Sequence, residues 1–167
     1  ADLPENEVNH RARIIGLGAV KYADLSQDLT LDYVFSWEKM LAMQGNTAPY
    51  LQYAVARIKS IFRKMENDPK GSFPAARPPE SDPERKLSRK LIFFPLALKQ
   101  ATRELKPHFL CTYLYELATE FSSFYNQEKV MVDDPATRDL RLLLCSSTQS
   151  FLITGLGLLG IDTLDEM

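Results

Sequence analysis

The sequence is poor in the residues from which metal sites and disulfide frameworks are built. It has two cysteines, Cys111 and Cys145, and two histidines, His10 and His108, in 167 residues. None of the four has a further thiol, imidazole or paired carboxylate at ligand spacing. We therefore exclude a disulfide scaffold and a cysteine-based zinc site, expect no metal site, and expect both thiols to be reduced and buried.

Long apolar runs are also missing. No segment approaches the roughly 18 residues that a membrane helix needs, and the opening residues ADLPENEVNH are too polar for a signal or transit peptide. We expect a cytoplasmic protein that does not contact membranes. The chain begins with alanine, so we expect it to be cut from a longer polypeptide. Its length suits one domain, or one domain plus a piece of another.

Catalytic patterns are absent too. There is no Ser/His/Asp or Cys/His set, no phosphate-binding GxxxxGK[ST] loop and no convincing pair of catalytic carboxylates. The stretch 155–160, GLGLLG, fits the dinucleotide pattern GxGxxG, but it ends seven residues before the last one and leaves no room for a βαβ unit. Close helix packing, with Gly160 ending the helix, explains it better. We expect no catalysis by this chain alone.

What the sequence does contain is apolar residues at helical spacing. Before residue 47 the pattern predicts a helix over 11–26, an extended or strand segment over 29–35 without an obvious partner strand, and a short helix over 37–43 capped by Ser36. Thr47 is then placed to cap a long helix that reaches about residue 65. Pro49 suits the first turn of that helix, where its missing N–H has no helical partner.

The second half predicts further helices separated by proline-bearing loops. Residues 67–82 hold five prolines or glycines and form a loop. Ser81 and Glu84 have capping-box spacing and begin a helix that restarts at Pro95 and reaches residue 105. The next two helices open at Pro107 and at Asp134-Pro135. The predicted inward faces are Leu110, Tyr113, Leu114, Leu117, Phe121, Phe124 and Tyr125, and then Leu140, Leu143, Leu144, Ser147, Phe151 and Leu158. We therefore predict an all-α, antiparallel helical bundle.

Positive charge is concentrated in the middle of the chain. Residues 50–106 hold 13 lysines and arginines against six acids, a net charge of +7, while the remainder carries −9. A local basic surface attracts a polyanion even on an acidic protein, because salt screens charges beyond about 10 Å. A solvated, charged helix face explains the same counts, and charge alone favours that second interpretation.

The stretch 43–63, MQGNTAPYLQYAVARIKSIFR, is the best candidate binding site. A polar loop (Gln44, Gly45, Asn46, Thr47) leads into a helix on which Tyr50, Tyr53 and Arg57 share one face. Aromatic rings beside arginine and flexible amides are typical of single-stranded RNA recognition, in which bases stack on rings and are read at their edges. The alternative is that both tyrosines are core residues with bonded hydroxyls.

Several segments resemble the carboxy-terminal part of arginyl-tRNA synthetases. The block GNTAPYLQYAVARI, with KYADLS and DYVF upstream, TYLYELATEFSSFYN downstream and the ending LLGIDTLDEM, carries the resemblance, which covers residues 11–167. It implies that 47–167 is a helical anticodon-binding domain of the DALR type. It also implies that 1–46 is the tail of the catalytic region, a linker with a helix and a short extended segment.

The resemblance implies both a function for this chain and an activity that it lacks. The family uses ATP to attach arginine to its tRNA in a catalytic domain with HIGH and KMSKS-like motifs, and neither motif is present here. The chain is therefore expected to bind arginine tRNAs without aminoacylating them. ATP and Mg²⁺ are expected only in the parent enzyme, and that parent is expected to be monomeric.

The resemblance also points to individual residues. The anticodon-binding positions of the family match Gln44, Gly45, Asn46, Thr47, Tyr50, Tyr53, Arg57, Tyr125 and Met167. The carboxylate of Met167 would belong to the site only if Met167 is the natural terminus. From these residues we predict that Tyr50 and Tyr125 stack on splayed anticodon-loop bases. Two alternatives stay open: a helical adaptor that binds another protein, and a complete small enzyme, which the missing catalytic motifs oppose.

Overall fold

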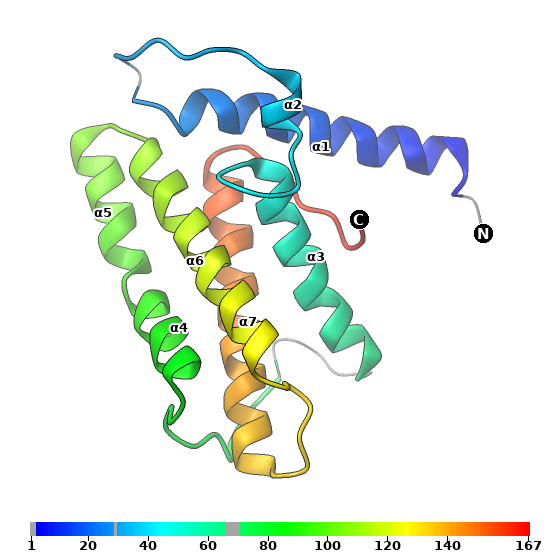
Figure 1. The fold of residues 1–167 in the computed structure, drawn as a ribbon, viewed down its shortest axis with the longest axis vertical. Helices are drawn as coiled ribbons and strands as arrows, with labels where there is room; N and C mark the ends of the chain where they lie inside the picture. The colour runs from blue at the N-terminus through cyan, green and yellow to red at the C-terminus, as the bar shows by residue number, and fades with distance from the viewer. Residues whose placement is uncertain (1–2, 29, 66–70) are drawn as a thin grey trace.

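The computed structural model describes residues 3–28, 30–65 and 71–167, and in these residues the chain is helical with no strand (Figure 1). The helices are α1 (Glu5–Leu25), α2 (Trp37–Met40), α3 (Ala48–Lys64), α4 (Asp82–Ile92), α5 (Phe94–Glu104), α6 (His108–Gln127) and α7 (Pro135–Leu158). Helices α3 to α7 form the bundle, and α1 crosses one end of it (Figure 1). The all-α bundle predicted from the sequence is confirmed.

Polar residues begin the helices where the sequence placed them. The side chains of Ser36, Thr47 and Asp134 accept hydrogen bonds from main-chain N–H groups in the first turns of α2, α3 and α7. Ser81 and Glu84 form the predicted capping box of α4. Because each cap satisfies a donor that the helix leaves unpaired, the starting points of these helices were readable from sequence.

Three predicted details are wrong. The first helix begins at Glu5 rather than 11, with acidic residues in its first turn. The predicted segment 29–35 forms no strand in its described part, 30–35, because the described residues contain no second strand to pair with it. Residue 29 lies outside the described residues, as do 66–70. On α7, Leu143 and Leu158 are 41% and 58% exposed, because leucines occur on several sides of this helix.

The core explains the glycines near the end of α7. A Cβ added to Gly155 would lie 2.5 Å from Leu114 Cδ2, so only glycine lets α7 approach α6 this closely. Gly160 follows the helix with a φ of 70°, as a helix-ending glycine does. Packing and chain reversal therefore account for the GLGLLG stretch. Cys111 and Cys145 are buried free thiols, and burial raises the pKa of each to about 12.

Candidate nucleic-acid interface

One arginine lies between two tyrosine rings at the surface of the bundle. The Arg57 guanidinium carbon is 4.7 Å from the centre of the Tyr53 ring and 5.3 Å from the centre of the Tyr125 ring. Arg57 Nη2 also donates to the Tyr53 hydroxyl over 3.0 Å. Tyr53 and Arg57 are four residues apart on α3, so they share a face, whereas Tyr125 comes from the end of α6. Cation–π attraction holds the three groups together.

These three side chains line an open cavity of about 500 Å³. Met167 lines it too, although 110 residues separate it from Arg57 in the sequence. The structure therefore brings together four of the predicted residues: Tyr53, Arg57, Tyr125 and Met167. The cavity is also lined by residues that the sequence interpretation missed, which are Ala56, Ser60, Arg63, Asn126 and Glu166. Ser60 could have been found, because it lies one turn beyond Arg57 on the same face.

Tyr50 lies outside this cavity. Its hydroxyl is 3.1 Å from Ser122 Oγ and 3.4 Å from the Ala118 carbonyl oxygen, and its ring packs edge-on to Tyr115 at 6.0 Å. Tyr50 is half-buried between α3 and α6. The bonded hydroxyl matches the core alternative that the sequence left open, and stacking of Tyr50 on a base stays a prediction.

The predicted loop lies at the start of α3, separate from the cavity. Gln44, Gly45 and Asn46 are exposed, and Gly45 has a φ of 80° that favours glycine. The Asn46 side-chain oxygen accepts a hydrogen bond from the buried Tyr22 hydroxyl over 2.7 Å, which anchors the loop to α1. Eleven residues of mostly helical chain separate Asn46 from Arg57, which is about 16 Å at 1.5 Å per residue. A ligand that contacts both must span that distance.

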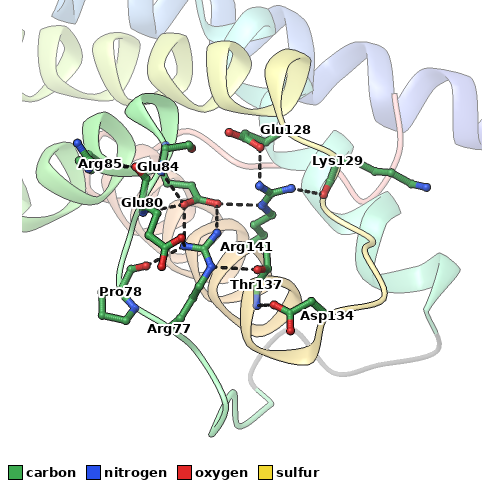
Figure 2. Close-up of polar contacts among 11 residues, drawn as sticks. Arg77, Pro78, Glu80, Glu84, Arg85, Glu128, Lys129, Asp134, Thr137 and Arg141 are labelled. Atoms are coloured by element: carbon green, nitrogen blue, oxygen red, sulfur yellow. Dashed lines mark hydrogen bonds and ion pairs between the residues drawn. The ribbon is translucent and has the colours of Figure 1, made fainter.

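A buried charge cluster supports the end of α6 that carries Tyr125 (Figure 2). Glu84 is fully buried and accepts hydrogen bonds from Arg77 and Arg141. Burial by itself would raise the pKa of Glu84, but these bonds and the main-chain N–H groups of Glu80 and Ser81 lower it to about 2. Arg141 extends to the end of α6, where it binds the Glu128 carboxylate at 2.5 Å and the Lys129 carbonyl oxygen at 2.7 Å.

Within residues 3–28, 30–65 and 71–167, no group of three or more His, Cys, Asp or Glu side chains could hold a metal ion. No helix of this part of the chain is both long and apolar enough to cross a membrane. The groups that the cavity offers to a ligand include aromatic rings, an amide and guanidinium groups.

Comparison with known families agrees with that chemistry. A family model described as the DALR anticodon binding domain matches residues 51–167. The chain belongs to the DALR anticodon binding domain family. The DALR match includes Tyr53, Arg57, Tyr125 and Met167, while Tyr50 and the loop 44–47 precede it.

Relatives of this DALR chain are longer proteins. Arginine–tRNA ligases from Erwinia tasmaniensis and Cellvibrio japonicus are 44% and 45% identical to it, over 99% of this chain and 29% of theirs. Two solved arginyl-tRNA synthetases, each 33% identical, share the fold. The Plasmodium falciparum structure has a TM-score of 0.86 over 96% of this chain, and the Thermus thermophilus structure 0.85 over 99%. The DALR chain spans 28% of each of those chains.

Proposed function

We propose that this chain binds the anticodon loop of arginine tRNAs, as part of a longer arginine–tRNA ligase. The observation that carries the proposal is the placement of Arg57 between Tyr53 and Tyr125 on an open cavity, in a chain of the DALR family. Arginine–tRNA ligases are the relatives that align with nearly its whole length. The rings, the guanidinium group and the cavity can each contact a different part of an RNA chain.

The cavity accepts one unstacked base. Tyr125 is 37% exposed at the end of α6, so part of its ring is free for stacking, which contributes about 1–3 kcal/mol per base. Arg57 donates one hydrogen bond among the described residues, which leaves further guanidinium N–H groups for a base edge or a phosphate. Met167 closes one side of the cavity with an apolar surface. A neighbouring cavity of about 410 Å³, which shares Ser60 and Tyr125 and includes Lys64 and Lys129, gives room for the flanking nucleotide.

The exposed loop 44–47 supplies a second contact. Its amide groups lie about 16 Å along α3 from Arg57, a distance that several nucleotides of a splayed loop can bridge. In this proposal the tyrosine cluster and the amide-rich loop contact different nucleotides of one anticodon loop, and so form one extended site. In this scheme the identity of the tRNA is read at base edges, while the local positive charge attracts the backbone.

The residues before α3 connect this unit to the rest of the longer protein. The segment 31–43 exposes seven large apolar side chains, which are Leu31, Tyr33, Val34, Phe35, Trp37, Leu41 and Met43. A packed neighbour would bury this surface, and the relatives are more than three times as long as this chain. We assign residues 1–46 to the junction with a catalytic part that binds ATP and Mg²⁺ in a monomeric, cytoplasmic enzyme.

A filter-binding titration tests the proposal. The 167-residue chain is titrated with an arginine tRNA, with a second tRNA of different anticodon, and with the two anticodon stem-loops alone. We expect tighter binding of the arginine tRNA and of its stem-loop. Equal binding of both tRNAs, or none, contradicts the proposal and favours an adaptor that binds another protein. Arginine-dependent exchange of pyrophosphate into ATP by this chain would contradict the assignment of catalysis to the rest of the enzyme.

A further inference from the structure

The last residues of the chain return from α7 to lie along α1 and α3 without forming a helix (Figure 1). Two of their side chains are anchored in the interior, because Ile161 is 2% exposed and Leu164 is 6% exposed. Apart from Met167, the residues between and beyond these anchors are polar. Its path is therefore determined by more than the hydrophobic effect.

Five side chains donate hydrogen bonds to main-chain carbonyl oxygens of this tail, defined as residues 160–167. In order along the tail, these bonds are Lys21 to Gly160 (2.5 Å), Gln52 to Asp162 (2.8 Å), Lys59 to Leu164 (3.3 Å), Arg63 to Asp165 (2.8 Å) and Arg11 to Glu166 (3.3 Å). The donors come from α1 and α3 alone. Because the acceptors are main-chain groups, the donors hold the backbone of the tail rather than particular side chains.

Carboxylates of the tail add ion pairs to the same donors. Lys59 Nζ lies 2.6 Å from Asp165, and Arg63 lies 3.2 Å from Glu166. The hydrogen bond from Lys59 lowers the pKa of the Asp165 carboxyl. The side chain of Asp165 is 85% exposed, so this pair alone contributes little. Together with the four charged donors and the Gln52 amide on carbonyl oxygens, such pairs restrain the tail along its whole length.

The tail ends in the cavity of Tyr53, Arg57 and Tyr125, which Glu166 and Met167 both line. We propose that Lys59, one of the residues of α1 and α3 that bind the tail, is a positioning residue that keeps Met167 against the bound base. This rests on the proposed RNA-binding function. Lys59 does not line the cavity, and its side chain is 19% exposed. Its contribution to RNA binding therefore passes through the tail.

Methyl-labelled methionine gives a direct readout, because the chain has five methionines. In the 167-residue chain the Met167 methyl signal should carry the ring-current shift of the neighbouring tyrosines. We expect Lys59→Ala to move this signal toward that of an exposed methionine and to leave the other four in place. Lys59→Arg should keep it, since a guanidinium can donate to the same carbonyl. Lys99→Ala is the matched control, because Lys99 is exposed on α5, which supplies none of the five donors to the tail.

Affinity for an arginine anticodon stem-loop completes the test. We expect Lys59→Ala and Met167→Ala each to weaken binding by about 5-fold, and the double variant to lose little more than one of them, since both act through the same contact. An unmoved Met167 signal in Lys59→Ala, or losses that multiply in the double variant, overturns the inference. If the methyl signal moves but the unmodified chain does not bind the stem-loop, the tail site stands and the proposed function fails.

Discussion

Arginine serves opposite purposes in two regions of this molecule. In the cluster around Glu84, every guanidinium nitrogen of Arg77 and Arg141 donates a hydrogen bond within the protein, to a carboxylate, a carbonyl oxygen or the Thr137 hydroxyl, and the central carboxylate is fully buried (Figure 2). In the cavity beside α3, Arg57 donates one hydrogen bond among the described residues and otherwise faces the rings of Tyr53 and Tyr125. The first region is closed on itself and the second is open.

The difference separates groups that hold the fold from groups that can bind. A buried carboxylate is tolerated only when its hydrogen bonds are made within the protein, so the Glu84 carboxylate binds groups of the fold rather than a ligand. An arginine held by ring faces keeps free N–H groups, so it can exchange water for RNA at little cost. Substitutions around Glu84 should therefore change the free energy of unfolding, whereas substitutions in the cavity should change the affinity for RNA.

The largest effect is expected on unfolding. Glu84→Gln removes the buried charge that the half-buried guanidinium groups of Arg77 and Arg141 bind, and we expect a loss of about 3–5 kcal/mol in the free energy of unfolding, measured with urea. Glu80→Gln is the matched control, because its side chain is 71% exposed and 3.9 Å from Arg77. A loss below about 1 kcal/mol in Glu84→Gln would show that the cluster does not hold the fold.

Acid should reproduce part of that loss. The pKa of Glu84 is lowered from 4.5 to about 2 in the folded chain, so its stabilisation is complete above pH 4.5 and disappears as the pH falls toward 2. Because each pKa unit between the folded and unfolded chain corresponds to about 1.4 kcal/mol, the lowered pKa contributes about 3 kcal/mol to the free energy of unfolding. Urea midpoints followed from pH 6 to pH 2 should decline across this window, and the decline should be smaller in Glu84→Gln. Parallel curves for the two proteins would contradict the assignment.

Arg57→Ala should change binding instead. We expect affinity for an arginine anticodon stem-loop to fall about 10- to 100-fold, since charged hydrogen bonds contribute roughly 1.5–3 kcal/mol. The free energy of unfolding should change by less than about 1 kcal/mol, because no buried charge is left unpaired. Arg89→Ala, an exposed position on α4, is the control for a general loss of positive charge. A folded Arg57→Ala variant with normal affinity would remove Arg57 from the site.

The smallest effect should come from the two tyrosine hydroxyls on α3. Tyr50→Phe loses the contact with Ser122 and should cost about 1 kcal/mol of stability, measured by thermal unfolding. Tyr53→Phe removes the acceptor for Arg57 and should weaken RNA binding by a few-fold, with less effect on melting. The prediction that Tyr50 stacks on a base needs Tyr50→Ala: an affinity loss in a protein that still melts normally would support it.

Much of the fold could be predicted from the sequence, because the patterns that specify it lie within a few neighbouring residues. Capping residues satisfy N–H groups within one helical turn, so Ser36, Thr47, Ser81 and Asp134 marked helix starts without tertiary information. Spacing also placed Tyr53 and Arg57 on one face of α3. The same rule put Tyr50 on that face, where the structure directs its hydroxyl to Ser122 on α6. Spacing reports the face of a helix but not what that face meets.

Apart from the start of α1, the errors and omissions concern contacts between residues far apart in the sequence. Leucines follow one another so closely in α7 that their pattern did not reveal that Leu143 and Leu158 point outward. Glu84 was recognised as a capping residue, but nothing in its neighbourhood indicated that Arg141, 57 residues away, would bind it. Gln52 carried no signal at all, although it is buried and donates to the Asp162 carbonyl oxygen.

The sequence by itself determined the helices, the starting points of the four helices with side-chain caps, the absence of catalytic motifs and the resemblance to one family. These features depend on residues close together in the chain or on characteristic stretches of sequence. Tertiary structure alone decided which residues share the cavity. Arg57, Tyr125 and Met167 meet there because α3, α6 and the tail pack side by side, and packing depends on side-chain contacts that no local pattern contains. Tertiary structure also decided that Arg141 is bonded to the carboxylates of Glu84 and Glu128, whereas Arg57 keeps N–H groups for a ligand.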